Sequence, residues 1–303
     1  MPRQSARPRT LNEYLVWGAR AFKRARLYYG HGTDNAADDS FQLVLSVLAW
    51  PVARAQRQLN RALTQPQSAA VMAAFRQRMQ TRRPSAYLTG EAWFAGLRFH
   101  VDSRVLIPRS PIAELIAARF QPWLTQSPRR ILDLCAGSGC IGIACAKTFS
   151  KAHVDLGELD QAALVVAQRN IRRHRLGKRT TAVESDLFKA LVGRKYDLIV
   201  SNPPYVPLAE WKRLPAEYRH EPRKALEAGR DGMDIVARIL DEAALYLAPM
   251  GLLVCEIGGS MREFEKRFPR FPALWPEFER GGDGVFIITR EELLDWKRKS
   301  RVR

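Results

Sequence analysis

The four residues Asn202-Pro203-Pro204-Tyr205 carry the clearest chemical signal in this sequence. They follow the run 196–201, whose composition is typical of a buried strand. Proline lacks an N–H, has a fixed φ and pushes the preceding residue into an extended geometry, so this loop is stiff and the Pro203 carbonyl is left out of any ladder. That carbonyl and the Asn202 amide oxygen are two acceptors spaced for one NH₂ group. The motif therefore predicts binding of a planar amide or base, the alternative being an ordinary proline-rich turn.

A second motif, at 133–142, is typical of a nucleoside-binding loop. Gly137, Gly139 and Gly142 form a G-x-G-x-x-G pattern between an expected strand and an expected helix. Glycines at such positions allow a tight turn and the close approach of a ligand to the backbone. An acid that binds ribose hydroxyls is expected about 20 residues later, and Glu158 stands 21 positions after Gly137. Together these features predict a cofactor that contains a nucleoside.

Two further acids favour S-adenosylmethionine (SAM) over NAD, although both cofactors contain adenosine. Asp133 lies at a strand tip, where a carboxylate could face the cationic methionine end and would repel a pyrophosphate. Asp186 ends the third expected strand, in position for the adenine amino group. The alternatives are a loop-bracing carboxylate for Asp133 and a helix N-cap for Asp186. The expected cofactor site comprises Asp133, Cys135, Ala136, Gly137, Ser138, Gly139, Glu158, Asp186, Leu187 and Asn202.

These motifs require a sheet whose strand ends meet at one edge. From residue 129 onward, short apolar runs alternate with helical patterns, which is the rhythm of a mostly parallel α/β sheet. Strands are expected at 131–134, 154–158, 180–184, 197–201 and 252–257. Helices are expected at 141–148, 161–174 and 232–247. A β-hairpin is expected at the end, with strands at 274–279 and 285–289.

The first part of the chain has a different pattern. Residues 10–83 show apolar side chains at helical spacing and no convincing strand, and Pro66 is expected to open the third helix. From 92 to 107 the pattern becomes strand-like, which predicts a small hairpin between two domains. A helix is expected to begin at Pro111.

Composition limits the class of protein further. The chain has 303 residues and a net charge of +18, with 49 Lys and Arg against 31 Asp and Glu. This excess suggests a polyanionic partner such as nucleic acid or ribosomes, the alternative being a charged surface that only favours solubility. We find neither a secretory signal nor an apolar run long enough for a membrane span, so we expect a cytoplasmic location. The cysteines lack metal-site spacing and are expected to be small buried hydrophobes: Cys135, Cys140, Cys145 and Cys255.

With these motifs in place, the sequence resembles class I SAM-dependent methyltransferases. More narrowly, it resembles the HemK/Prm family of protein glutamine-N5 methyltransferases over nearly its whole length. The most similar branch modifies a glutamine of large-subunit ribosomal protein L-three. The resemblance to this branch rests on the segments 28–35, 104–116, 217–222 and 281–286. The sister branch, which modifies release factors, typically carries Pro-Arg-Pro followed by an acid and Thr, and the segment 108–111 departs from that pattern. Family members often have Asp where this chain has Glu158, whose longer side chain should still reach the ribose.

The resemblance implies a Rossmann-like seven-stranded sheet, parallel except for the hairpin strand, behind a helical N-terminal domain. We expect a substrate-recognition domain at 1–90, a β-hairpin linker at 91–110, a methyltransferase domain at 111–295 and a basic tail at 296–303. It also implies that Asn202 and Pro203 hold the substrate amide. The expected catalytic residues are Asn202, Pro203, Pro204 and Tyr205.

On this hypothesis Asn202 and the Pro203 carbonyl align the amide nitrogen, and Tyr205 packs against the flat amide. The reaction needs no strong general base, so His220 is not assigned as one. The residues expected to shape the loop over the site or to dock the substrate are His31, Arg109, Arg219, His220 and Glu221.

Several other functions remain open from the sequence. The same loop suits an amino group on an rRNA or DNA base, and a release factor could be the protein substrate. A dehydrogenase is disfavoured by Asp133 and by the Asn-Pro-Pro-Tyr loop. A ribosome-assembly factor that binds rRNA is the non-enzymatic alternative.

Overall fold

The computed structural model describes residues 8–279 and 281–301, and it divides into two compact units. Unit 1 comprises Met1–Ala92, Val101–Ser103 and Pro215–His220. Unit 2 comprises Trp93–His100, Arg104–Leu214 and Glu221–Arg303. The segment 215–220 therefore packs with the N-terminal helices, although it lies in sequence between two parts of the sheet-containing unit.

Unit 1 is helical, as its apolar spacing predicts. Capping boxes at Thr10 and Thr64 begin its first and fourth helices. Pro66 lies in the first turn of a helix, as expected, but this is the fourth helix and not the third, because the short α3 precedes it. The helices are α1 (Leu11–Arg24), α2 (Ala36–Leu48), α3 (Val52–Arg57), α4 (Gln65–Thr81) and α5 (Ser85–Thr89).

A buried ion pair crosses the apolar core of unit 1. The Arg78 Nε lies 2.9 Å from an oxygen of Asp39, and both side chains are almost fully buried. The Arg78 guanidinium also donates hydrogen bonds to the carbonyls of Tyr28 and Arg82. These bonds replace the hydration that the guanidinium loses on burial in a medium of low dielectric constant.

Unit 2 is built on a mostly parallel sheet, which confirms the predicted α/β class. Among the described residues the strand order is β5-β4-β3-β6-β7-β8, and only β8 runs antiparallel to its neighbour. The strands are β3 (Arg130–Leu134), β4 (His153–Glu158), β5 (Thr180–Glu184), β6 (Tyr196–Ser201), β7 (Leu247–Glu256) and β8 (Val285–Thr289). Strands β1 (Glu91–Phe94) and β2 (Leu97–His100) form the separate hairpin, which ends earlier than the expected 107.

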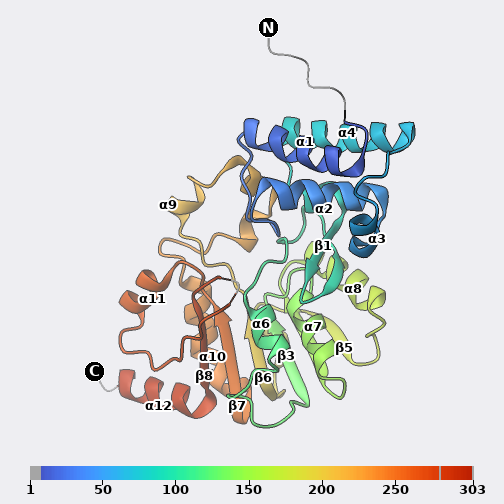
Figure 1. Ribbon diagram of the computed structural model, residues 1–303. Coiled ribbons are helices and arrows are strands. Elements are labelled where there is room, and N and C mark those ends of the chain that lie inside the picture. The colour runs from blue at the N-terminus through green and yellow to red at the C-terminus, as the bar shows by residue number, and fades with distance from the viewer. Residues whose placement is uncertain (1–7, 280, 302–303) are drawn as a thin grey trace. The chain divides into compact units, whose positions relative to one another are not determined.

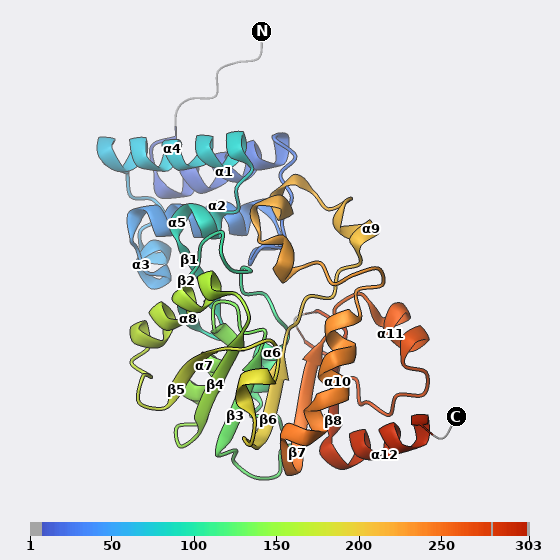
Figure 2. The same cartoon turned by 180° about the vertical axis from the view of Figure 1, so that it is seen from behind.

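Helices cover both faces of this sheet, because its strands alternate apolar side chains between the two faces. Leu132 and Leu134 pack in the cluster that includes α10, whereas Asp133 lies against Gly142 of α7. Figure 1 shows α6 on the near side of the sheet, and the reverse view in Figure 2 shows α10 on the other side. The helices are α6 (Ile112–Ala117), α7 (Cys140–Thr148), α8 (Gln161–Arg173), α9 (Leu208–Trp211), α10 (Asp234–Tyr246), α11 (Met261–Arg267) and α12 (Arg290–Arg301).

The expected seventh strand is wrong for the part of the chain that the structure describes. At 274–279 the ladder is reduced to an isolated antiparallel bridge, in which Leu274 and Ile287 exchange backbone hydrogen bonds of 3.0 and 2.9 Å. Pro272 and Pro276 flank Leu274, and neither has the N–H that a longer ladder would need.

The segment expected as a basic tail, 296–303, is helical where the structure describes it. Residues 296–301 belong to α12, while 302–303 lie outside the described residues. Trp296 packs edge-on against Phe268 and Phe271, which anchors this helix to the apolar cluster of unit 2. In the described parts of the chain, we find no helix with the length and apolar character that crossing a membrane requires.

The close packing of α7 on β4 makes Gly142 a sensitive position. An added Cβ would lie 2.2 Å from Leu156 Cδ2 and 2.9 Å from Asp133 Cβ. We expect Gly142→Ala to lower the free energy of unfolding by about 1–3 kcal/mol through overpacking, despite the higher helix propensity of alanine. Urea denaturation measures this loss. Gly177→Ala is the control, since an added Cβ there meets no atom within 4 Å, and equal stability of the two variants would contradict the prediction.

Candidate active site

A cavity of about 540 Å³ opens at the carboxyl ends of β3, β4, β5 and β6, and all of its lining residues belong to unit 2. After β3 the chain continues on one side with β4 and later returns on the other side with β6. Ligands of open α/β sheets bind at such a reversal of strand order. The position of the cavity is therefore the one that the topology favours for a cofactor.

The glycine loop forms the floor of this cavity. Gly137 has a φ of 53° and space where a Cβ would point, and Gly139 has a φ of 77° at the N-cap of α7. These left-handed conformations favour glycine. The residues of the predicted loop that line the cavity are Cys135, Ala136, Gly137 and Ser138, whereas Gly139 does not line it.

Glu158 closes the same end of the cavity, as its spacing predicts. Its carboxylate accepts hydrogen bonds from the backbone N–H groups of Gly137 at 2.8 Å and Asp160 at 2.9 Å. Burial raises the pKa of Glu158, although these two bonds lower it. The side chain is thus held in place by the loop and by the start of α8, with further lone pairs available to accept hydroxyl hydrogens.

Asp133 does not line the cavity. One of its oxygens accepts a hydrogen bond of 2.7 Å from the Gly142 N–H, and burial raises its pKa to about 7. These contacts are those of a carboxylate that braces the loop, which was the alternative interpretation. Direct contact of Asp133 with a cofactor stays a prediction.

Asp186 and Leu187 line the cavity at the end of β5. The Asp186 carboxylate forms ion pairs of 2.7 Å with both Lys189 and Arg238, and their hydrogen bonds lower its pKa. The carboxylate is therefore ionised and fixed by two cations rather than capping a helix, since Phe188 occupies the N-cap of the following turn. Binding of an adenine amino group by Asp186 stays a prediction.

The Asn-Pro-Pro-Tyr loop leaves β6 beside the glycine loop. The Ser201 hydroxyl donates a 2.9 Å hydrogen bond to the Leu134 carbonyl, which joins the ends of β6 and β3. Asn202 and Pro204 line the cavity, whereas Pro203 and Tyr205 do not. The Tyr205 hydroxyl donates a hydrogen bond to Glu256. Packing of its ring on the substrate amide stays a prediction.

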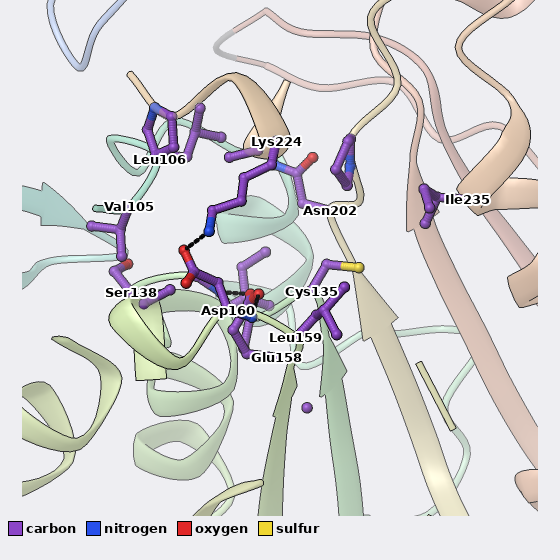
Figure 3. A pocket seen from close by; sticks show the side chains of 18 of the residues that line it. Val105, Leu106, Cys135, Ser138, Glu158, Leu159, Asp160, Asn202, Lys224 and Ile235 are labelled. Carbon is purple, nitrogen blue, oxygen red and sulfur yellow. Dashed lines mark hydrogen bonds and ion pairs between the residues drawn. The ribbon is translucent and has the colours of Figure 1, made fainter. Parts of the chain in front are cut away.

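A short segment at 221–225, which sequence reasoning treated only as a candidate loop, supplies another wall. Lys224 extends across the cavity and forms a 2.6 Å ion pair with Asp160, the N-cap of α8 (Figure 3). Glu221 anchors the segment by a bidentate contact with Arg109 at 2.6 and 2.8 Å, and it also accepts from the Ile107 N–H. The sequence analysis did not assign Lys224 or Asp160 to the site, although both line the cavity.

The remaining candidates lie in unit 1. The His31 ring packs against Tyr218 in a tilted arrangement, with ring centroids 4.3 Å apart, and a ring nitrogen of His220 lies 2.9 Å from the Thr81 carbonyl. Glu217 accepts a hydrogen bond from the Tyr28 N–H and pairs with Arg82. His31 and His220 thus help to hold the segment 215–220 within unit 1.

Comparison with known proteins decides the family. A ribosomal protein uL3 glutamine methyltransferase of Francisella tularensis subsp. tularensis is 41% identical over 290 residues, covering 95% of this chain and 92% of that protein. A protein of the same name from Xylella fastidiosa is 44% identical over 286 residues, covering 94% and 91%. The chain belongs to the family of ribosomal protein uL3 glutamine methyltransferases.

A family model agrees with this membership. Residues 113–217 match the model of the methyltransferase small domain. Among solved structures, the catalytic domain of hMettl16 in complex with the MAT2A 3'UTR hairpin 6 shares 17% identity, with a TM-score of 0.49 over 76% of this chain and 84% of its own. Family membership confirms the prediction of a methyltransferase and of SAM as its cofactor.

The residues around the cavity fit SAM. The glycine loop exposes backbone at Gly137, and the Glu158 carboxylate is placed to accept ribose hydroxyls. Leu159 and Leu187 provide apolar walls beside it, which suit a flat base. These groups lie between the ends of β4 and β5, and placement of the nucleoside there stays a prediction.

This placement predicts that Glu158→Gln weakens SAM binding about 10- to 100-fold, since bonds to a charged acceptor contribute roughly 1.5–3 kcal/mol. Because burial raises the pKa of Glu158, the carboxyl takes up its proton at a higher pH than usual. Wild-type affinity should therefore fall as the pH is lowered, beginning above the pH at which an ordinary Glu takes up its proton, whereas the variant should lose this dependence. Calorimetric titration with SAM measures both effects. Exposed Glu265→Gln is the control, and a Glu158→Gln variant with wild-type affinity would refute the placement.

Proposed function

We propose that this chain transfers a methyl group from SAM to the side-chain amide nitrogen (N5) of a glutamine in ribosomal protein uL3. The observation that carries the proposal is the position of Asn202, whose side chain lines the cavity at the end of β6 beside the glycine loop. The names of the two relatives, which match over nearly the whole chain, support uL3 as the substrate.

A glutamine nitrogen is a weak nucleophile, because its lone pair is delocalised into the carbonyl. When bound, SAM supplies an electrophilic methyl group. Asn202 Oδ1 and the Pro203 carbonyl would accept the two amide hydrogens and hold the nitrogen in one orientation. Such alignment can lower a barrier by up to roughly 7–11 kcal/mol in favourable intramolecular cases.

The same two acceptors also stabilise the positive charge that develops on the nitrogen. As the nitrogen forms its new bond it becomes more positive, and fixed acceptors that face it stabilise this charge without reorganisation. The stiffness of the two prolines keeps the acceptors in place. The S–CH₃ bond would break as the N–CH₃ bond forms, and the nitrogen, which becomes acidic, would release its proton to water. No strong base is therefore required, and the contact between His220 and the Thr81 carbonyl fits this assignment.

A labelled-methyl assay tests the proposal directly. Purified protein is mixed with SAM and with uL3, a release factor or rRNA, and mass spectrometry locates the methylated residue. We expect label on a glutamine of uL3 alone. Label on the release factor would show that the release factor, and not uL3, is the protein substrate. Label on rRNA would favour the base-methylating alternative.

The matched variant in this assay is Asn202→Ala. We expect turnover to be nearly abolished while SAM binding is spared, because Glu158 and the glycine loop remain intact. Near-normal turnover would refute the role of Asn202. Retained ribosome assembly in cells that carry the inactive variant would instead reveal a second, non-enzymatic role.

We further propose that the chain contacts rRNA on pre-ribosomal particles. We also propose that it acts in the cytoplasm. From 161 to 183 the sequence contains no Asp or Glu. The exposed cations of this stretch, here called the α8 basic surface, are Arg169, Arg172, Arg173, Arg175 and Lys178. Clustered cations with no acid among them suit a phosphate backbone, and this supports RNA as the polyanion.

This second proposal predicts a salt-dependent RNA affinity that depends on the α8 basic surface. Replacing Arg172, Arg173 and Arg175 by Gln should weaken binding of an rRNA fragment and reduce the slope of log K against log salt by about 0.7–0.9 for each phosphate that the variant no longer neutralises. Filter binding at several salt concentrations measures this. The control replaces Arg262, Lys266 and Arg270, which are also exposed in unit 2, and equal effects of the two triple variants would contradict a specific surface.

A further inference from the structure

A buried carboxylate, Glu256, lies beside the Asn-Pro-Pro-Tyr loop without lining the cavity. It ends β7, which pairs with β6 so that Cys255 stands opposite Ser201. One Glu256 oxygen accepts a 3.0 Å hydrogen bond from the Tyr205 hydroxyl, and the other accepts a 2.5 Å hydrogen bond from the Ser110 hydroxyl. Glu256 therefore joins the end of the loop to the segment 104–110.

Tyr205 is held from several sides at once. The Ser260 hydroxyl donates a 3.0 Å hydrogen bond to its carbonyl. A Cβ added at Gly258 would lie 2.7 Å from the Tyr205 ring, and one at Gly232 would lie 2.1 Å from the Tyr205 carbonyl oxygen. The ring and the backbone of this residue are thus packed so closely that the side chain acts as an anchor.

The electrostatics of Glu256 favour strong contacts with these hydroxyls. Burial raises its pKa, while the hydrogen bonds from Ser110 and Tyr205 and the nearby charge of Arg109 lower it. Both oxygens accept a hydrogen, which an ionised carboxylate does best, and hydrogen bonds to an ionised acceptor are about twice as strong as neutral ones. Because the group is buried, losing one of them leaves a costly unsatisfied atom.

We propose that Glu256 is a positioning residue of the methyl transfer, acting through Tyr205 to place Asn202 at the edge of the cavity. Ser110, which lines the cavity, donates a hydrogen bond to the same carboxylate and so ties it to the segment 104–110. The inference rests on the proposed function and deepens it, because it assigns the fourth residue of the motif to holding the loop rather than to touching the substrate.

The consequence is kinetic. A loosened anchor leaves the SAM end of the cavity intact, since Glu158 and the glycine loop lie on other strands. It shifts the acceptors that hold the amide nitrogen, and a misplacement of about 1 Å can lower a rate about 100-fold. The loss should therefore appear in kcat and not in the affinity for SAM.

Tyr205→Phe, Glu256→Gln and the double variant test this with uL3 as substrate. Tyr205→Phe removes one oxygen atom and should lower kcat about 10- to 100-fold, with SAM affinity within about twofold of wild type. Glu256→Gln, which keeps the size of the side chain and one carbonyl acceptor, should lower kcat less. The loss in the double variant should be smaller than the product of the two single losses, because both changes disturb the Tyr205–Glu256 hydrogen bond, while Glu256→Gln also disturbs the bond from Ser110.

The chain offers a matched control in Tyr196→Phe. The Tyr196 hydroxyl also donates to a carboxylate, that of Asp155, at 2.8 Å, but it lies at the opposite end of β6. This variant should lose stability in thermal unfolding and keep kcat. If Tyr205→Phe behaves like Tyr196→Phe, if the double variant shows additive losses, or if SAM affinity falls with kcat, the inference is overturned.

These outcomes are separable from the proposed function. If wild-type protein methylates no glutamine, the proposed function fails whatever the variants do. If the wild type is active and Tyr205→Phe is equally active, only the positioning role fails.

Discussion

The parallel pairing of β3 with both β4 and β6 is the constraint on which the site depends. Leu134 stands opposite Gly157 on one side and Ser201 on the other, so the loops that leave these strands begin at one level. The Ser201–Leu134 hydrogen bond joins the ends of β6 and β3, and the Glu158–Gly137 hydrogen bond joins the end of β4 to the loop after β3. A shift of one residue in either pairing would turn each side chain to the other face and separate the cofactor residues from Asn202.

Around this register, buried carboxylates hold backbone and loops rather than substrate. Asp133 accepts from Gly142, Glu158 from Gly137 and Asp160, and Glu256 from two hydroxyls. Burial raises the pKa of all three, which is the cost of placing acids where water is excluded. Rigid support of this kind matters for a weak nucleophile, whose reaction depends mainly on alignment.

Predictions from the sequence agree best with the structure where a short local pattern allows only one backbone conformation. The glycine loop, the acid 21 residues later and the strand before Asn202 follow from backbone sterics and apolar runs, and the structure places them as expected around one cavity. They were wrong for the seventh strand near the C-terminal end. The strand at 274–279 is shortened by prolines, and the basic segment from 296 is helical because Trp296 finds an aromatic cluster that no local pattern shows.

The sequence by itself determined the family, the α/β class and the identity of the two motifs, because residue types and short spacings carry that information. Tertiary structure decided which acids face the cavity and which brace it. It paired Lys224 with Asp160, Glu221 with Arg109 and Tyr205 with Glu256, partners that lie 64, 112 and 51 residues apart in the chain. Such contacts depend on how strands and connecting segments meet in space, and hydrogen bonds and ion pairs act over a few ångströms whatever the sequence separation.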